Sequence, residues 1–302
     1  MHQIQVSAPQ GKGEEVARVA LKSGIQQASV QTAYVHGPNQ EKDVVTVMVE
    51  TPTAKKFVDA LMTASFFNPQ DYEIASQQMP AIISSEKPAK LTHPFDMPSP
   101  DVYEDMWLQN HINPSYLARA FVSALLLAYG MIQNDLITMI AALLFTPFLP
   151  QVLGAGFGIV TRQWRLVGQG LMVLGISTAI TVISGVIVAS IAGGPLQYNT
   201  FNSILVNFLI SLIVGIAAGY ATADIAGRRE LIAIAAAAQF SIYPAWFGIM
   251  LVLGLPGAAV VSQRLLTYLV NVVTILVVST LVYLTLRYKS EVIERYSKAV
   301  RS

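Results

Sequence analysis

Six stretches of this sequence are long, apolar and almost free of charge, and they constrain the fold more than any other feature. A helix needs about 20 mainly apolar residues to cross a bilayer. Only 12% of the residues are charged, roughly half of what a soluble domain carries. The sequence therefore predicts an α-helical membrane protein with about six transmembrane helices. The stretches are Ser115–Ile132, Leu136–Val160, Leu166–Ala192, Phe201–Ile225, Leu231–Leu253 and Leu265–Arg287.

Basic residues between these stretches predict the orientation of the chain. Arg162 and Arg165 lie in the second connection, Arg228 and Arg229 lie in the fourth, and further Lys and Arg residues follow the sixth stretch. The opposite connections hold a single basic residue, Arg264. Because Lys and Arg are enriched in cytoplasmic loops, we expect both termini on the cytoplasmic side of the cell's inner (plasma) membrane. No signal peptide is visible at the N-terminus.

The first third of the chain has a different character. Residues 1–105 carry 8 Lys and Arg against 13 Asp and Glu, whereas residues 106–302 carry 11 against 5. The order strand, helix, strand, strand, helix, strand is typical of a ferredoxin-like (βαββαβ) domain, which we place in the cytoplasm over residues 1–85. The strands are predicted in Gln3–Ala8, Gln27–Tyr34, Asp43–Thr51 and from Asp71 onward, and the helices after Gly13 and after Pro52.

Chemistry-bearing residues are sparse in this domain. His2 and His36 are isolated, and the chain has no cysteine, which excludes disulfides, thiol catalysis and thiolate metal sites. The sequence Gly11-Lys12-Gly13 before a helix is compatible with an anion at the helix N-terminus or with a plain turn. No catalytic triad, carboxylate pair or metal cluster is visible. We therefore expect neither enzymatic activity nor a cofactor, and no nucleic-acid partner.

The remaining boundaries follow from composition. Residues 86–110 are rich in proline and predict a linker, with an amphipathic helix at the membrane surface over its last ten residues. Residues 111–288 are assigned to the transmembrane domain. Residues 289–302 are predicted to be a basic cytoplasmic tail.

The second and fifth stretches resemble each other. Asp135–Thr146 and Glu230–Ser241, aligned at an offset of 95, share five identities in twelve positions. Membrane helices share composition, so chance similarity is the alternative. A true duplication of three helices places its two halves in opposite senses across the membrane. This 3+3 inverted repeat is a recurring design of secondary transporters.

Both of these stretches contain proline in their middle, and we predict that both helices are broken there. Proline removes a backbone donor and frees the carbonyl one turn earlier, and lipid cannot satisfy such groups. Two matched breaks therefore predict a solute path between the two helices, whereas kinks that aid packing are the alternative. The candidate path residues are Thr146, Pro147, Pro150, Gln239, Ser241, Tyr243, Pro244 and Asn271; the polar ones could equally link helices by hydrogen bonds.

Arg119 is the other polar residue of interest, about one turn into the first stretch. Its side chain is expected either to reach the cytoplasmic surface or to contact an anion inside the membrane domain. Asp135, Asp224 and Glu230 lie at the ends of stretches, where acidic residues cap helices.

Several local sequences resemble one family of bacterial and archaeal membrane proteins, the domain of unknown function 389 family. The resemblance lies in Asn113-Pro114-Ser115-Tyr116, in the broken segment that opens at Asn134, in the alanine-rich Ile232–Ala238, and in Leu265–Asn271. It covers roughly residues 105–287, and members commonly have a small cytoplasmic domain before that region. The resemblance implies an architecture and leaves the activity open.

Two functions fit these features. The first is a transporter or channel-like protein for a small solute, with an anion among the candidates, regulated or oligomerised by the cytoplasmic domain. The second is a non-transporting scaffold or sensor whose soluble domain binds an effector. Both need the lipid bilayer as a partner, and we expect a homo-oligomer.

Overall fold

The computed structural model describes residues 2–35, 40–49, 51–68, 70–78, 99–146, 148–222, 229–286, 288 and 290–299. The described residues form two compact units. The first unit holds those up to residue 105 together with 288 and 290–299, and the second holds 106–222 and 229–286.

The first unit is a four-stranded antiparallel sheet with helices, as the sequence predicts. Its strands are ordered β2-β3-β1-β4. Inward-facing residues such as Ile4 and Val47 alternate with outward-facing ones, and they pack against Val16, Phe57 and Leu61 of the helices. The elements are β1 (His2–Pro9), α1 (Gly13–Lys22), β2 (Ala28–Val35), β3 (Gln40–Val49), α2 (Thr51–Thr63) and β4 (Glu73–Gln78).

The end of the chain also belongs to this unit. The segment predicted as a tail contains a helix, α11 (Ser290–Ala299), which packs against α2. Val292 of α11 is fully buried in the core of the first unit. The Lys55 ammonium lies 4.8 Å from the centre of the Tyr288 ring, a distance typical of a cation–π contact.

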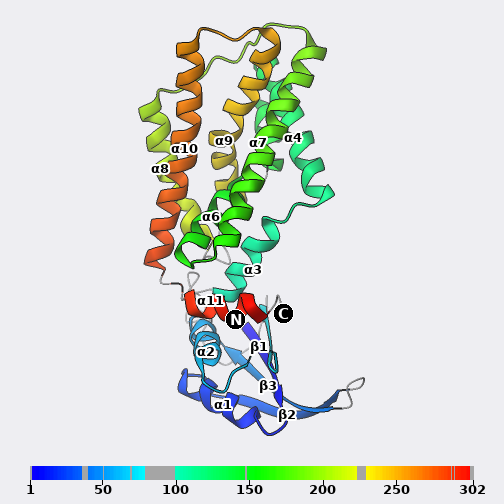
Figure 1. The fold of residues 1–302 in the computed structure, drawn as a ribbon, viewed down its shortest axis with the longest axis vertical. Coiled ribbons are helices and arrows are strands. Elements are labelled where there is room, and N and C mark those ends of the chain that lie inside the picture. The colour runs from blue at the N-terminus through cyan, green and yellow to red at the C-terminus, as the bar shows by residue number, and fades with distance from the viewer. Residues whose placement is uncertain are drawn as a thin grey trace. The chain divides into compact units, whose positions relative to one another are not determined.

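The second unit is a bundle of apolar helices (Figure 1). Five of them are long and apolar enough to cross a membrane, and α5 and α6 make a sixth if the two count as one bent span. Large apolar side chains such as Ile137 (81% exposed) and Ile213 (66% exposed) point outward, as expected where lipid replaces water. After α3 (Ser99–Gln109), the helices are α4 (Pro114–Gln133), α5 (Leu136–Phe145), α6 (Leu149–Val160), α7 (Trp164–Ala192), α8 (Ile204–Ala221), α9 (Arg229–Leu253) and α10 (Ala258–Thr285).

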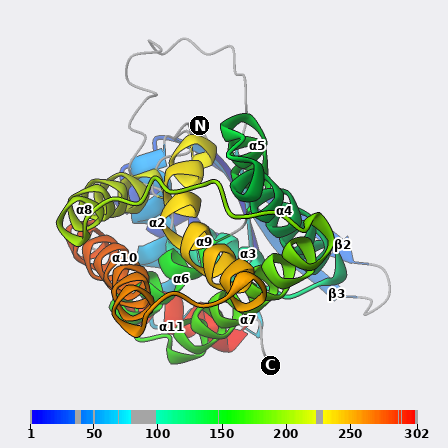
Figure 2. The same ribbon diagram turned by 90° about the horizontal axis from the view of Figure 1, so that it is seen from above.

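Helix α9 lies in the middle of this bundle (Figure 2) and contacts every other helix from α4 to α10. Small residues make its closest approach to α7 possible. A β-carbon on Gly185 of α7 would lie 2.7 Å from the Ala245 carbonyl oxygen of α9, and one on Gly248 of α9 would overlap the Val182 carbonyl. Close backbone approach at small residues is the usual way in which membrane helices pack.

The predicted break in the second stretch is present. Helices α5 and α6 meet at an angle of 42°. Thr146, between them, has an extended backbone (φ −80°, ψ 115°), which is the conformation that a following proline favours. Pro150 sits in the first turn of α6, where a missing N–H costs nothing. Pro147 lies outside the described residues.

The predicted break at Pro244 is wrong, because α9 continues through this proline from Arg229 to Leu253. A single proline removes one hydrogen bond, to the carbonyl four residues earlier, and costs about 3 kcal/mol. Helix α9 contacts α4–α8 and α10, and Pro244 and the residues on either side of it, Tyr243 and Ala245, are buried, so packing offsets this cost. The α5–α6 segment is bent after Thr146, whereas one proline does not interrupt α9.

The α7–α9 crossing yields a first prediction. We expect Gly248→Ala or Gly185→Ala to lower the free energy of unfolding by about 1–3 kcal/mol, because the added methyl group has no room. Thermal unfolding in detergent measures this effect. Gly175→Ala is the control, since a β-carbon there meets nothing within 4 Å and alanine is the better helix former. If all three variants lost the same free energy of unfolding, the close contact of α7 and α9 at Gly185 and Gly248 would be contradicted.

Candidate functional site

The α5–α6 break lies directly against α9. Phe148, between Thr146 and α6, packs its ring against Phe240 of α9, with ring centroids 6.5 Å apart and nearly edge to face. Both side chains are almost fully buried. The structure therefore brings together the two regions that the sequence pairs, and fills the space between them with an aromatic contact.

Thr146 is held inside this region by two hydrogen bonds. Its hydroxyl donates to the Ala142 carbonyl at 3.0 Å and shares a 2.5 Å hydrogen bond with Ser123 of α4. The Pro150 carbonyl accepts a hydrogen bond of 3.0 Å from the Asn110 side chain. Both residues thus connect the break to neighbouring segments.

Two polar side chains on α9 close to Phe240 lack hydrogen-bond partners among the described residues. They are the buried Ser241 hydroxyl and the buried Oε1 atom of Gln239. Ser241 lies on the same stripe of α9 as Ala237 and Ala245, which pack in the cluster formed with α4 and α5. Buried polar groups without partners are rare and each calls for an explanation.

Asn271 has a different environment from these two. It is fully buried, donates 3.1 Å to the Gln239 carbonyl of α9, and accepts 3.2 Å from the Ser211 hydroxyl of α8. Its side chain thus links α8, α9 and α10. The point of contact on α9, the Gln239 carbonyl, lies five residues before Pro244. Asn271 therefore links helices by hydrogen bonds, which the sequence analysis gave as the alternative to lining a solute path.

A second buried network joins α4, α6 and α7, and the sequence analysis missed it. Tyr116 of α4 hydrogen-bonds both the Gln151 amide of α6 and the Ser177 hydroxyl of α7. The only sequence signal was the presence of these polar side chains within apolar stretches. Spacing alone did not show that three separate stretches would bring them together.

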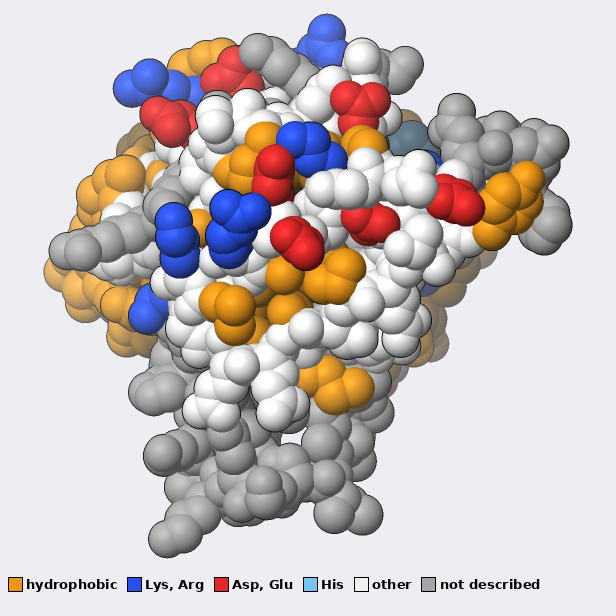
Figure 3. Space-filling view, turned by 90° about the horizontal axis from the view of Figure 1, so that it is seen from below, with side chains coloured by type: hydrophobic (Ala, Val, Ile, Leu, Met, Phe, Trp, Pro, Cys, Tyr) orange, Lys and Arg blue, Asp and Glu red, His pale blue; other side chains and the backbone are white. Residues whose placement is uncertain are grey.

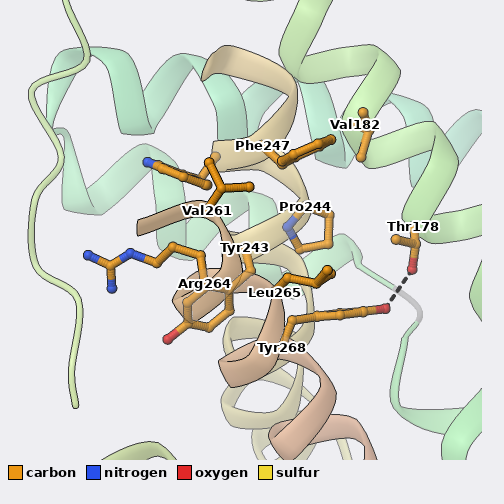
Figure 4. Close-up of a pocket in the computed structure, with 10 residues that line it drawn as sticks. Thr178, Val182, Tyr243, Pro244, Phe247, Val261, Arg264, Leu265 and Tyr268 are labelled. Atoms are coloured by element: carbon orange, nitrogen blue, oxygen red, sulfur yellow. Dashed lines mark hydrogen bonds between the residues drawn. The ribbon is translucent and has the colours of Figure 1, made fainter. Parts of the chain in front are cut away.

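Tyr243 and Pro244 line a cavity of about 100 Å³ on another face of α9 (Figure 4). Figure 4 shows Tyr268 reaching across from α10 to Thr178 of α7, where their hydroxyls form a 2.8 Å hydrogen bond. Arg264 lies on the side of the cavity away from Thr178. The remaining lining is apolar: Val182, Trp246, Phe247, Val261 and Leu265.

Arg264 is the second feature that the sequence analysis missed. Its guanidinium carbon lies 3.8 Å from the centre of the Phe201 ring, and its buried Nε has no hydrogen-bond partner in the described part of the chain. Phe201 also packs against Tyr243, at 5.8 Å between centroids. The sequence offered one sign of it: Arg264 is the single basic residue in the connections predicted to lie on the side of the membrane opposite the termini.

Arg119 is not among the residues that line the cavity. It is exposed on α4. An exposed position near the start of a membrane helix is the usual place for an arginine that reaches the surface.

In the first unit, the glycine turn before α1 is occupied by the protein itself. The Gly13 N–H donates 2.9 Å to the Asp43 carboxylate, which takes the place that an external anion would need. A polar surface pocket of about 650 Å³ lies nearby, lined by Pro9, Gln10, Tyr34, Glu41, Lys42, Gln70 and Asp71.

Two further observations concern the wider chemistry of the chain. Acidic and basic side chains both occur on the face drawn in Figure 3. Among the described residues, no group of three or more His, Cys, Asp or Glu side chains is placed to hold a metal ion.

Comparisons with models of protein families, with curated proteins and with solved structures found no match to this chain.

The Asn271 network yields a second prediction. Asn271→Leu keeps the volume but removes the hydrogen bond to the Gln239 carbonyl and the acceptor of the buried Ser211 hydroxyl, so we expect a loss of about 1–3 kcal/mol in unfolding free energy. Combining it with Ser211→Ala should cost less than the sum of the two single changes. Unfolding in sodium dodecyl sulfate measures both. Gln263→Leu, at an exposed position of the same helix, is the control and should change the free energy of unfolding little. If the effects of Asn271→Leu and Ser211→Ala simply add, the hydrogen bond between these two residues contributes nothing to stability.

The first unit yields a third prediction. Burial raises the pKa of the Asp101 carboxyl from 3.8 to about 6, although a hydrogen bond from Ser76 opposes the shift. A carboxyl with a higher pKa in the folded state makes that state less stable as the pH rises between the two values. We expect unfolding free energy to fall by about 1–3 kcal/mol between pH 4 and pH 6.5, and Asp101→Asn to remove this fall. Thermal unfolding across this pH range is the measurement, and Glu14→Gln, at an exposed position, is the control. If Asp101→Asn has the same pH dependence of stability as the original protein, this prediction is refuted.

Proposed function

We propose that this protein is a multi-pass membrane protein that passes a small solute along a path between the α5–α6 break and α9. The observation that carries the proposal is the 42° bend within an apolar span, packed against the central helix. A break in a membrane helix leaves backbone groups without their helical partners. Such groups are tolerated against protein or a water-filled path.

The unpartnered groups on α9 support the same location. The Ser241 hydroxyl lies on the stripe of α9 that packs in the cluster with α4 and α5, whereas the Gln239 side chain, two residues earlier, points to another side of the helix. Leaving a buried polar group without a partner costs about 1–3 kcal/mol. A path that wets on opening would provide these groups with water or solute as partners.

The Phe148–Phe240 contact makes the conformation described here a closed one. Hydrophobic constrictions close many membrane pathways because they exclude water from a narrow space. Thr146, Gln239 and Ser241 would line the path on opening, and Pro147 and Pro150 would form its bend. Asn271 supports α9 from behind.

The arrangement of helices supports an inverted repeat of α4–α7 and α8–α10. Helix α4 packs on α7 as α8 packs on α10, and α6 packs on α10 as α9 packs on α7. Each half also has one buried polar network, centred on Ser177 of α7 and Asn271 of α10. Each of these residues stands thirteen positions after the first residue of its helix. An inverted repeat with its site near the bilayer centre is common among transporters.

The remaining parts of the proposal concern the first unit. The strand order β2-β3-β1-β4 and the βαββαβ succession support a ferredoxin-like fold. The distribution of Lys and Arg supports cytoplasmic termini. In this arrangement the domain regulates the path or holds a homo-oligomer together. The resemblance to the domain of unknown function 389 family is part of the same proposal.

A second candidate function is a sensor without transport. It is favoured by the polar pocket that includes Tyr34, Lys42 and Asp71. Effector binding that is lost in a Lys42→Ala variant of the full chain, in a protein without solute flux, would favour the sensor.

The closed contact yields a fourth prediction. We expect Phe240→Ala to raise solute flux about tenfold, because removing the ring opens the constriction. Swelling of proteoliposomes in chloride, nitrate, acetate and glycerol measures the flux. Phe240→Leu, which keeps more of the packing volume, should give a smaller increase and guards against loss of folding.

Phe121→Ala provides the matched control, since Phe121 is an exposed phenylalanine on α4. Its flux should equal that of the original protein. If neither the original protein nor Phe240→Ala gives flux above empty liposomes for any of these probes, the transport proposal fails.

A further inference from the structure

Strand β2 forms one edge of the sheet in the first unit. Among the described strands it pairs with β3 only, so the backbone N–H and C=O groups along its other side have no neighbouring strand there. Four consecutive residues of β2, Ser29–Thr32, are exposed, and so is Tyr34. An edge of this kind is a template for pairing with a further strand.

The β2 edge lacks the features that usually prevent such pairing. Proteins protect an edge strand by charged residues, by proline or by short length. Strand β2 is eight residues long, and it contains no charged residue and no proline. The other edge strand, β4, has six residues; its Glu73 forms an ion pair with Lys42 at 3.7 Å, and its Ser76 hydrogen-bonds to Asp101 of α3. The two edges of one sheet therefore differ, and β2 is the one left open to a partner strand.

The exposed side chains on one face of β2 include two large apolar ones. Val30, Thr32 and Tyr34 alternate along the strand and therefore share a face. This is the core face of the sheet, because Val30 lies opposite the buried Val45 of β3. Val30 packs against the start of α1, where a β-carbon on Gly13 would lie 2.8 Å from it. Even so, Val30 is 43% exposed and Tyr34 is 54% exposed, so the core face continues to the open edge without a cover.

These side chains are complementary to a second copy of the same strand. In an antiparallel pair with a two-fold axis at Thr32, this residue lies opposite its own copy, and Val30 lies opposite Tyr34 on both sides of the axis. Aromatic residues opposite β-branched ones, and threonine opposite threonine, are favourable cross-strand pairs. A strand without charge offers no ion pair to select a different partner, whereas a two-fold contact needs only one self-complementary surface.

We propose that two copies of this chain pair through β2, as antiparallel strands centred on Thr32, and join their two sheets into one continuous sheet. This pairing specifies the homo-oligomer in the proposed function and rests on that part of it. One strand pair is a small interface, so the dimer is expected where both copies share a membrane. The contact is detected without flux, so this inference and the solute path can fail separately.

Cysteine cross-linking of the full chain at low density in liposomes tests this pairing, because the sequence contains no cysteine. In Thr32→Cys the two thiols would face each other with α-carbons about 5 Å apart, within the range of a disulfide. Mild oxidation should therefore give roughly fivefold more covalent dimer than in Ala75→Cys, the matched control at an exposed position of the other edge strand. Val30→Cys should cross-link poorly with itself and well with Tyr34→Cys when the two variants are mixed.

A charge placed on the edge provides the second test. In the Thr32→Cys background, Val30→Lys should lower cross-linking about fivefold, whereas Met48→Lys, at an exposed position of the inner strand β3, should leave it unchanged. Cross-linking that Val30→Lys does not reduce overturns the proposal, and so does equal cross-linking by Thr32→Cys and Ala75→Cys. If Val30→Lys does not fold, the mixture of Val30→Cys and Tyr34→Cys decides, and the absence of a mixed dimer overturns the proposal.

Two further outcomes identify what would replace this pairing. A dimer that a lysine-reactive cross-linker captures, while Thr32→Cys gives none, overturns the β2 contact and leaves the homo-oligomer standing. Oxidation of cell membranes that links Thr32→Cys to a different protein instead of to its own copy also overturns the proposal, in favour of a strand from that protein.

Discussion

The central position of α9, in contact with α4–α8 and α10, is the constraint on which the rest of the second unit depends. Over most of its length a helix in this position has neighbours on several sides, so each of these faces must fit its neighbour. Towards α7 the fit is made by Gly185 and Gly248, where the backbones nearly touch. Towards α8 and α10 it is made by Asn271, whose amide joins three helices. These contacts fix the position of α9 and thereby the positions of the break and the cavity beside it.

The sequence predicted most of the elements because their signals are local. Apolar length identifies the spans, and strand alternation identifies the sheet. The bend after Thr146 also follows from a local rule, since proline disfavours a helical conformation in the residue before it. The break at Pro244 was wrong because tertiary enclosure decides whether one missing hydrogen bond interrupts a helix. Helix α11 was missed for a related reason: its basic composition suggested a solvated tail, whereas Val292 is buried in the first unit.

The candidate site was predictable in part. Thr146 and Ser241 were candidates because polar residues near a proline stand out in an apolar stretch, and the structure places both of them in buried surroundings. The Tyr116–Gln151–Ser177 network was missed because its members come from three stretches, and no spacing relates them before the helices pack. Arg264 was noted only as an exception to the charge rule, since the aromatic ring that holds it, Phe201, lies in another connection. Contacts between distant segments are the part that a single sequence does not carry.

The contacts of α9 with α7 and with the α5–α6 segment differ in how much movement they allow. On the α7 side, Gly185 and Gly248 leave no room even for a β-carbon between the two helices, so the floor of the cavity at Pro244 is fixed to α7. On the side of the break, the rings of Phe148 and Phe240 are in contact, and Met139 and Ala142 of α5 pack in one cluster with Ala237 of α9. Helix α5 is short, ends at the bend, and exposes Leu136, Ile137 and Ile140 on its outer face. A path that opens as we propose therefore opens by movement of α5 about the Thr146 bend, with α7 and α9 remaining together as the rigid side of the pathway.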